Sequence, residues 1–98
     1  MSRDALFRQA AEALGFAPDG EIKAGGNYVP VLRDGSTLYL SGQVPRIGNA
    51  VVITGRAGIE VALEQAQRAA KICTLRALAL LQRELGSLND VRQILRLT

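Results

Sequence analysis

The chain has 98 residues, the size of one domain, and 48% of them are hydrophobic, which is enough to form a core. Its net charge of +3 comes from scattered basic residues, so it lacks the dense basic patch typical of nucleic-acid-binding proteins. The absence of histidine excludes histidine-based acid–base catalysis, Ser–His and Cys–His nucleophiles and nearly all zinc sites. One cysteine excludes an internal disulfide, and no apolar run reaches the length of a membrane span, so we expect a cytoplasmic protein.

The first predicted element is a helix over residues 2 to 14, where apolar residues recur at helical spacing. Ser2 is a suitable N-cap for this helix, and Gly15 is suited to end it. Residues 16 to 27 are rich in glycine and predict a connector.

Two strands of a hairpin are predicted over residues 28 to 33 and 37 to 43, with Asp34-Gly35 as the turn signal. Pro30 cannot donate to a ladder, so the first strand should lie at a sheet edge or contain a bulge.

In the second of these strands, Leu38 and Leu40 should point to one face. Tyr39, Ser41 and Gln43 should point to the other face. Residues 51 to 54 predict a third short strand, and Gly55 and Gly58 bracket the turn after it.

The strongest periodicity predicts a long helix over residues 61 to 85, ended by Gly86. Its apolar face should consist of Leu63, Ala66, Ala70, Cys73, Ala77 and Leu80. Residues 72 to 81 are almost entirely apolar, so we expect this half to be covered on more than one side. A capping box would need Ser or Thr at position 62, where the chain has alanine.

Residues 91 to 98 predict a last strand, which could run parallel to an earlier one because a long helix connects them. The order of elements therefore predicts an α+β fold, in which the long helix packs on one face of a small mixed sheet. Such a last strand would expose a hydrogen-bonding edge, which favours an oligomer.

The order of several short motifs resembles the RidA family, also called YjgF or endoribonuclease L-PSP. The runs GNYVPVLRDGSTLYLSGQVPR and TGRAGIEVALEQAQRAAKICTLRALALLQRELGSLNDVRQILRLT carry the resemblance, over roughly residues 25 to 98. They contain, in family order, a Gly-x-Tyr start, Ser41-Gly42-Gln43, a Thr-Gly turn, the long helix and a Gly-x-Leu-x-Asp turn. The N-terminal helix is similar to that of the longer-headed branch of the family.

The resemblance implies a chorismate-mutase-like α+β fold and a homotrimer with ligand clefts between subunits. Family members hydrolyse enamines and imines to 2-oxo acids and ammonia, without metal or organic cofactor. By position, the substrate-binding residues would be Tyr28 at the cleft mouth and Ser41 and Gly42 along its wall. The family's cleft arginine and its water-associated glutamate would lie beyond Thr98. The resemblance therefore implies that residues 1 to 98 form a single incomplete domain with residues 2 to 14 as an extension.

Ser41 and Gly42 fit a carboxylate ligand because such a ligand needs a hydroxyl and accessible backbone N–H groups. The alternative is a strand end bent by glycine. Tyr28 is either a cleft residue or an amphipathic side chain at a sheet edge. We interpret Cys73 as a small core residue rather than a nucleophile.

The remaining charged residues are interpreted as structural. Loop charges in solvent are expected at Arg33, Arg46 and Arg56. Arg92 and Arg96 share one face of the predicted last strand and are placed at a subunit contact. Surface charges of the long helix and its approach are expected at Glu60, Glu64 and Glu84.

Three functions stay open from the sequence. The first is a RidA-like deaminase, the second a non-catalytic small-molecule binding or regulatory member of the family with the same cleft, and the third a ribonuclease or translation inhibitor. The low charge density argues against the third.

Overall fold

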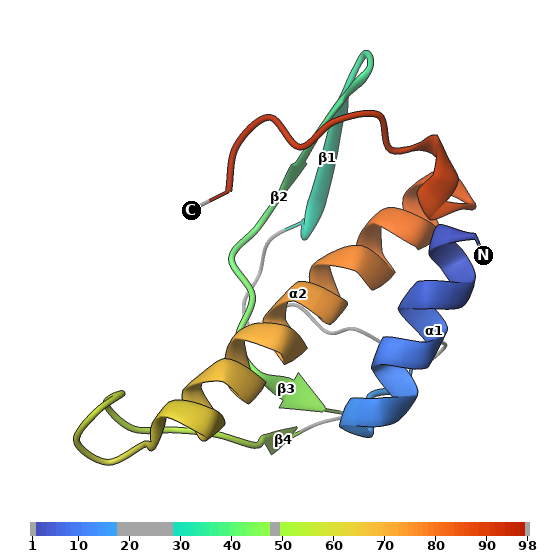
Figure 1. Ribbon diagram of the computed structural model, residues 1–98. Coiled ribbons are helices and arrows are strands. Elements are labelled where there is room, and N and C mark those ends of the chain that lie inside the picture. The colour runs from blue at the N-terminus through green and yellow to red at the C-terminus, as the bar shows by residue number, and fades with distance from the viewer. Residues whose placement is uncertain (1, 18–28, 48–49, 98) are drawn as a thin grey trace.

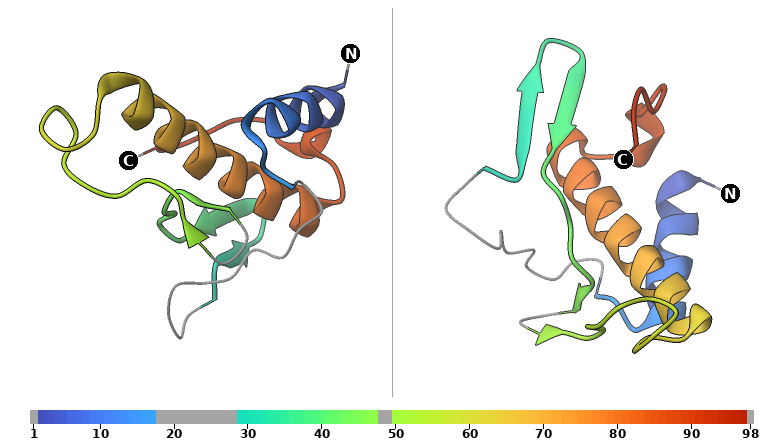
Figure 2. Two further views of the ribbon diagram at one scale, coloured as in Figure 1. Left: turned by 90° about the horizontal axis from the view of Figure 1, so that it is seen from below. Right: turned by 90° about the vertical axis from the view of Figure 1, so that its left-hand side faces the viewer.

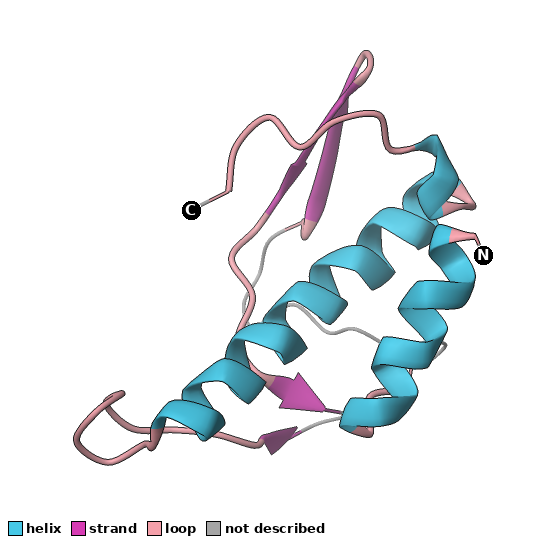
Figure 3. Ribbon diagram, in the orientation of Figure 1, coloured by secondary structure: helices cyan, strands magenta, loops and turns pink. Residues whose placement is uncertain are grey.

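A computed structural model describes residues 2–17, 29–47 and 50–97. In these residues two helices, one short 3-10 turn and two small antiparallel sheets form an α+β fold (Figures 1 and 3). The helices lie side by side, and the larger hairpin projects beyond them in both Figure 1 and the right-hand view of Figure 2. Neither helix combines the length and apolar character needed to cross a membrane in the part of the chain that is described.

Helix α1 (Arg3–Leu14) begins and ends where its local sequence predicts. The Ser2 hydroxyl accepts a hydrogen bond from the backbone N–H of Ala5 at 3.1 Å. Gly15 has a φ of 71°, and the N–H of Phe16 reaches back to the Ala11 carbonyl at 2.9 Å. This hydrogen bond is typical of a Schellman ending, and it directs the Phe16 side chain to pack with Phe7 and Ala11 of the helix.

Helix α2 (Leu63–Leu85) confirms the predicted long helix, and Gly86 ends it with a φ of 86°. Its predicted apolar face is only partly correct, because Leu63 is 68% exposed and Ala70 is also exposed. The buried positions are Ile72, Leu75, Arg76, Ala79 and Leu80. The first turns of α2 extend past the elements that pack on it, which leaves Leu63 and Ala70 exposed. The second half of the helix packs against α1 along a face next to the predicted one.

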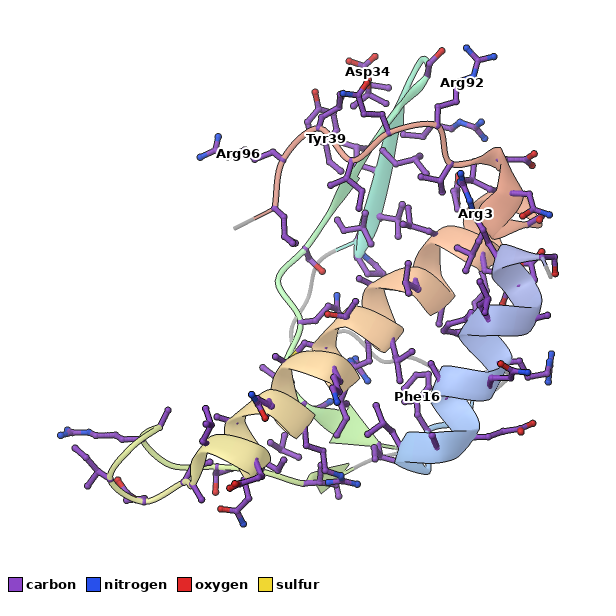
Figure 4. All side chains as sticks on the ribbon, viewed as in Figure 1. Arg3, Phe16, Asp34, Tyr39, Arg92 and Arg96 are labelled. Carbon is purple, nitrogen blue, oxygen red and sulfur yellow. The ribbon has the colours of Figure 1, made fainter. Side chains whose placement is uncertain are left out.

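The main core lies between the two helices and the turn that follows α2. Its buried members are Phe7, Ala11, Phe16, Leu75, Ala79 and Leu88. Figure 4 shows the Phe16 side chain between the two helices, where the Schellman ending directs it. α2 also contacts β1 and β3. Within residues 72 to 81 the Arg76 side chain bonds the Arg46 carbonyl of β3, as expected for a half that is covered on more than one side.

The predicted hairpin is present but shorter, with strands β1 (Val31–Asp34) and β2 (Thr37–Leu40). Asp34 pairs with Thr37, so the two turn residues are Gly35 and Ser36 rather than Asp34 and Gly35. Gly35 has a φ of 59° and Ser36 does not share this sign, which is the pattern of a type II′ turn.

Both predicted strands were too long. Pro30 lies before β1, and its carbonyl accepts from the Ser41 N–H at 2.9 Å. Residues 41 to 45 lie outside the ladder. Residues 18 to 28, including most of the predicted connector, lie outside the described residues.

The second sheet pairs two-residue strands β3 (Arg46–Ile47) and β4 (Ala50–Val51). The strand predicted over residues 51 to 54 is wrong beyond Val51, where no ladder continues. The turn predicted after it is present, but it extends beyond Gly58, since residues 58 to 60 are turn residues. Gly55 and Gly58 adopt positive φ angles of 121° and 82°.

The last predicted strand is also wrong in the described residues. After α2 the chain forms a 3-10 turn, η1 (Leu88–Asp90), and residues 91 to 97 have no strand partner. A parallel strand therefore does not join the hairpin, and the predicted mixed sheet is replaced by two separate antiparallel pairs. Arg92 and Arg96 are exposed, and Figure 4 shows both pointing away from the helices.

Candidate functional site

The predicted site lies where the chain leaves β2 and crosses toward β3. Ser41 and Gln43 are half-buried, whereas Gly42 between them is exposed. The Ser41 backbone is fixed by its hydrogen bond to the Pro30 carbonyl. The segment is thus a short bridge between the two sheets rather than the end of a strand.

Gln43 folds its side chain back onto Ser41. Its amide nitrogen Nε2 donates to the Ser41 carbonyl and to the Ser41 hydroxyl oxygen, both at 3.3 Å. Its carbonyl oxygen Oε1 accepts from Nε of Arg76 at 3.1 Å. A continuous line of hydrogen bonds therefore runs from Arg76 through Gln43 to Ser41.

Arg76 is a site residue that the sequence analysis missed. It is only 3% exposed, although it is an arginine on α2, and its Nη1 also donates to the Arg46 carbonyl at 3.3 Å. A buried guanidinium is costly unless its donors are satisfied, so these bonds are needed to keep it inside. The one available signal was an arginine within residues 72 to 81, a run in which Thr74 is the only other polar residue.

Arg46 was predicted to be a solvated loop charge, and this prediction is wrong. It belongs to β3 and is half-buried. Within the described part of the chain, its buried Nε makes no hydrogen bond. Leaving such a donor unsatisfied costs about 1–3 kcal/mol, so an acceptor from water, a ligand or another subunit would stabilise it. Arg33 and Arg56 are exposed, as predicted, although Arg33 lies in β1 and not in a loop. Exposure is also as predicted at Glu60, Glu64 and Glu84.

Gly42 is not required by the packing of this chain. A Cβ atom built there meets no atom within 4 Å among the described residues, and its φ is not in the left-handed region. The alternative that glycine is needed to bend the strand end therefore has no support from its backbone. Tyr28, the third predicted site residue, lies outside the described residues.

Cys73 is half-buried on α2, which agrees with a core role. Burial raises the pKa of its thiol, and the nearby Arg76 charge offsets this only in part. A raised pKa disfavours the thiolate, so this cysteine is a poor nucleophile at neutral pH.

A separate apolar groove of about 380 Å³ opens between α1, α2 and the segment after η1. It is lined by Arg3, Leu6, Phe7, Ala10, Leu75, Leu78, Leu81, Leu88, Val91 and Ile94. Among the described residues, neither Ser41 nor Gly42 contributes to it, and its lining includes none of the hydroxyl and amide groups of the Ser41 segment.

The chain is similar to known proteins both in sequence and in fold. No known protein-family profile matches the chain. The protein TCP17 of Trypanosoma cruzi is 32% identical over 71 residues, which are 72% of this chain and 44% of that protein.

Two solved structures share the fold. A candidate endoribonuclease from Shewanella oneidensis has a TM-score of 0.75 and 30% identity, over 90% of this chain and 58% of its own. The protein Atu1372 of Agrobacterium tumefaciens, whose function is unknown, has a TM-score of 0.71 and 33% identity, over 92% of this chain and 54% of its own.

These similarities extend over most of the chain but only part of each relative. The chain spans about half the length of the proteins that it matches. The similarity to the Shewanella protein is a fold-level match to the RidA family, one of whose names is endoribonuclease L-PSP.

Proposed function

We propose that this chain supplies the carboxylate-binding wall of a RidA-like deaminase, which hydrolyses reactive enamines and imines to 2-oxo acids and ammonia. The half-buried Ser41 hydroxyl, bonded by Gln43 beside the buried Arg76, is the observation that carries the proposal. The fold-level match to the candidate endoribonuclease supports it.

In the proposed reaction, water adds to the imine carbon, ammonia leaves, and the carbonyl of the 2-oxo acid forms. Ser41 and the exposed backbone at Gly42 would hold the substrate carboxylate and so orient the imine carbon toward that water. The family resemblance implies a cleft arginine and a glutamate that have not been assigned to any of residues 1 to 98, so the reaction is proposed for a protein that includes them.

The same proposal includes a homotrimer with the cleft between adjoining subunits. Both outer edges of the β1–β2 hairpin lack a strand partner among the described residues. Leu32 and Tyr39 pair across this hairpin and are 63% and 57% exposed. Unpaired edges beside exposed apolar side chains favour contact with another copy.

Non-catalytic binding of a small carboxylate is the second candidate. In the described residues, the groups gathered at Ser41 are a hydroxyl, an amide and a guanidinium. These are binding groups, and none is a general base at neutral pH.

The deciding assay uses a protein that includes the cleft arginine and the glutamate, generates 2-aminoacrylate in situ with a PLP-dependent serine dehydratase and follows the release of ammonia. Catalysis would accelerate release above the rate in buffer, and Ser41→Ala would reduce the acceleration about 10-fold or more, because a hydrogen bond to a charged group is lost. Ser36→Ala is the matched control, since Ser36 is an exposed turn residue.

Three other results would reject the deaminase. Release at the buffer rate with retained binding of pyruvate would favour the second candidate. Release at the buffer rate without pyruvate binding would exclude both candidates. Release at the buffer rate together with cleavage of RNA would favour the ribonuclease instead.

A further inference from the structure

The Ser41 hydroxyl is bonded by Gln43, and Gln43 is in turn bonded by the buried Arg76. We infer that Arg76 and Gln43 are positioning residues, which turn the Ser41 hydroxyl into an outward-facing hydrogen-bond donor for a carboxylate. This inference deepens the proposed function and rests on it.

The Gln43 amide can adopt only one orientation between its neighbours. An arginine side chain can only donate, so the Gln43 group facing Arg76 Nε must be the carbonyl oxygen Oε1. A backbone carbonyl can only accept, so the group facing the Ser41 carbonyl must be the amide nitrogen Nε2. The two constraints agree, and each alone would exclude the flipped amide.

This orientation decides what the Ser41 hydroxyl does. Its oxygen receives a hydrogen from Gln43 Nε2 at 3.3 Å, so it acts as an acceptor on this side. The hydroxyl hydrogen must then donate in another direction, away from Gln43. Because Arg76 is buried, the Nε–H that anchors the amide is shielded from competing water. The result is a serine prepared to donate to an anion.

Gln43→Glu reverses the direction of this bond with almost no change in shape. A carboxylate at position 43 still accepts from Arg76 Nε, and the cation keeps it ionised. It cannot donate to Ser41, so the hydroxyl would turn inward and donate to it. We expect pyruvate, measured by titration calorimetry, to bind about 10- to 100-fold more weakly to this variant.

A double-mutant cycle separates this effect from simple repulsion between the introduced carboxylate and the ligand. In the Ser41→Ala background, Gln43→Glu should cause only a small further loss of pyruvate affinity, because no hydroxyl is left to reorient. An equal loss in both backgrounds would mean charge repulsion and would overturn the inference, as would unchanged affinity of Gln43→Glu alone. Gln43→Met carries no charge, and its affinity loss should also disappear in the Ser41→Ala background.

Unfolding measured without ligand distinguishes failure of the proposed function from failure of the positioning role. Unfolding of the wild type, Gln43→Met, Ser41→Ala and the double variant should give non-additive denaturation midpoints, because Gln43 Nε2 bonds the Ser41 hydroxyl. If the wild type does not bind pyruvate but this coupling is present, the proposed function fails and the hydrogen-bonded arrangement stands. Additive midpoints would overturn the positioning role itself.

Discussion

At the scale of single residues, Asp4 ties the start of α1 to the end of α2. Its carboxylate accepts from the Leu88 backbone N–H at 2.9 Å, from the Ser87 hydroxyl at 2.5 Å and from the Gln82 amide at 2.9 Å. These three bonds, in that order of effect, hold the pKa of Asp4 below its ordinary value of 3.8. The neighbouring Arg3 bonds the Leu88 and Val91 carbonyls, so both residues connect α1 to η1.

Asp4→Asn should lower the melting temperature at pH 7, because the ionised carboxylate is the better acceptor for all three donors. A carboxyl group whose pKa is lower in the folded than in the unfolded state stabilises the fold at pH values above its unfolded-state pKa. This stability is lost as the pH falls through the folded-state pKa. The difference between wild type and variant should therefore shrink below about pH 3.8. Thermal unfolding from pH 7 to pH 2 measures it.

Asp34→Asn is the matched control, because Asp34 is exposed at the hairpin, as Figure 4 shows. It should leave the melting temperature nearly unchanged at every pH. A pH-independent loss for Asp4→Asn would contradict the role assigned to its ionised form.

Residue roles that depend on near neighbours in the chain could be predicted from the sequence. Ser2, Gly15 and Gly86 act within one helical turn, and all three were identified correctly. Arg76 and Asp4 act on residues 30 to 84 positions away, so no local pattern could reveal their hydrogen-bond partners. The predicted binding roles of Ser41 and Gly42 stay predictions.

At the scale of elements, the helices were predicted well and the strands were not. A helix satisfies its own backbone hydrogen bonds, so its periodicity and caps are visible in the sequence. A strand needs a partner, and residues 91 to 97 have strand-like composition but no partner in the described part of the chain. The face of α2 was misassigned because it depends on where α1 packs.

Ala62 is the N-cap of α2, with extended φ and ψ of −68° and 162°. Its N–H donates to Gln65 Oε1 at 3.1 Å, so this half of a capping box exists. Alanine has no side-chain acceptor for the other half. Ala62→Ser should therefore raise the free energy of unfolding by about 1 kcal/mol in urea denaturation.

Ala70→Ser is the control for this substitution, because Ala70 is an exposed position inside the same helix. There serine should lower stability by about 0.5 kcal/mol, since its helix propensity is below that of alanine. Equal effects at both positions would mean that α2 does not begin at Leu63.

At the scale of the whole molecule, the larger hairpin is poorly covered. The β1–β2 hairpin projects from the helices (Figure 2), and its Leu32–Tyr39 pair is exposed. If this surface lies between subunits, Leu32→Asp should convert the oligomer to a monomer in sedimentation velocity, because a buried unpaired charge opposes association.

Leu63→Asp is the matched control, since Leu63 is 68% exposed at the start of α2 and should not alter the sedimentation coefficient. A wild type that sediments as a monomer at all concentrations would reject the subunit cleft.

The most direct test of the central claim is an amide-resonance titration of the protein with pyruvate. The account predicts saturable shifts at Ser41, Gly42 and Gln43, where the carboxylate would bind. No saturable shift, or shifts confined to residues of the apolar groove such as Leu6, Leu78 and Val91, would contradict it.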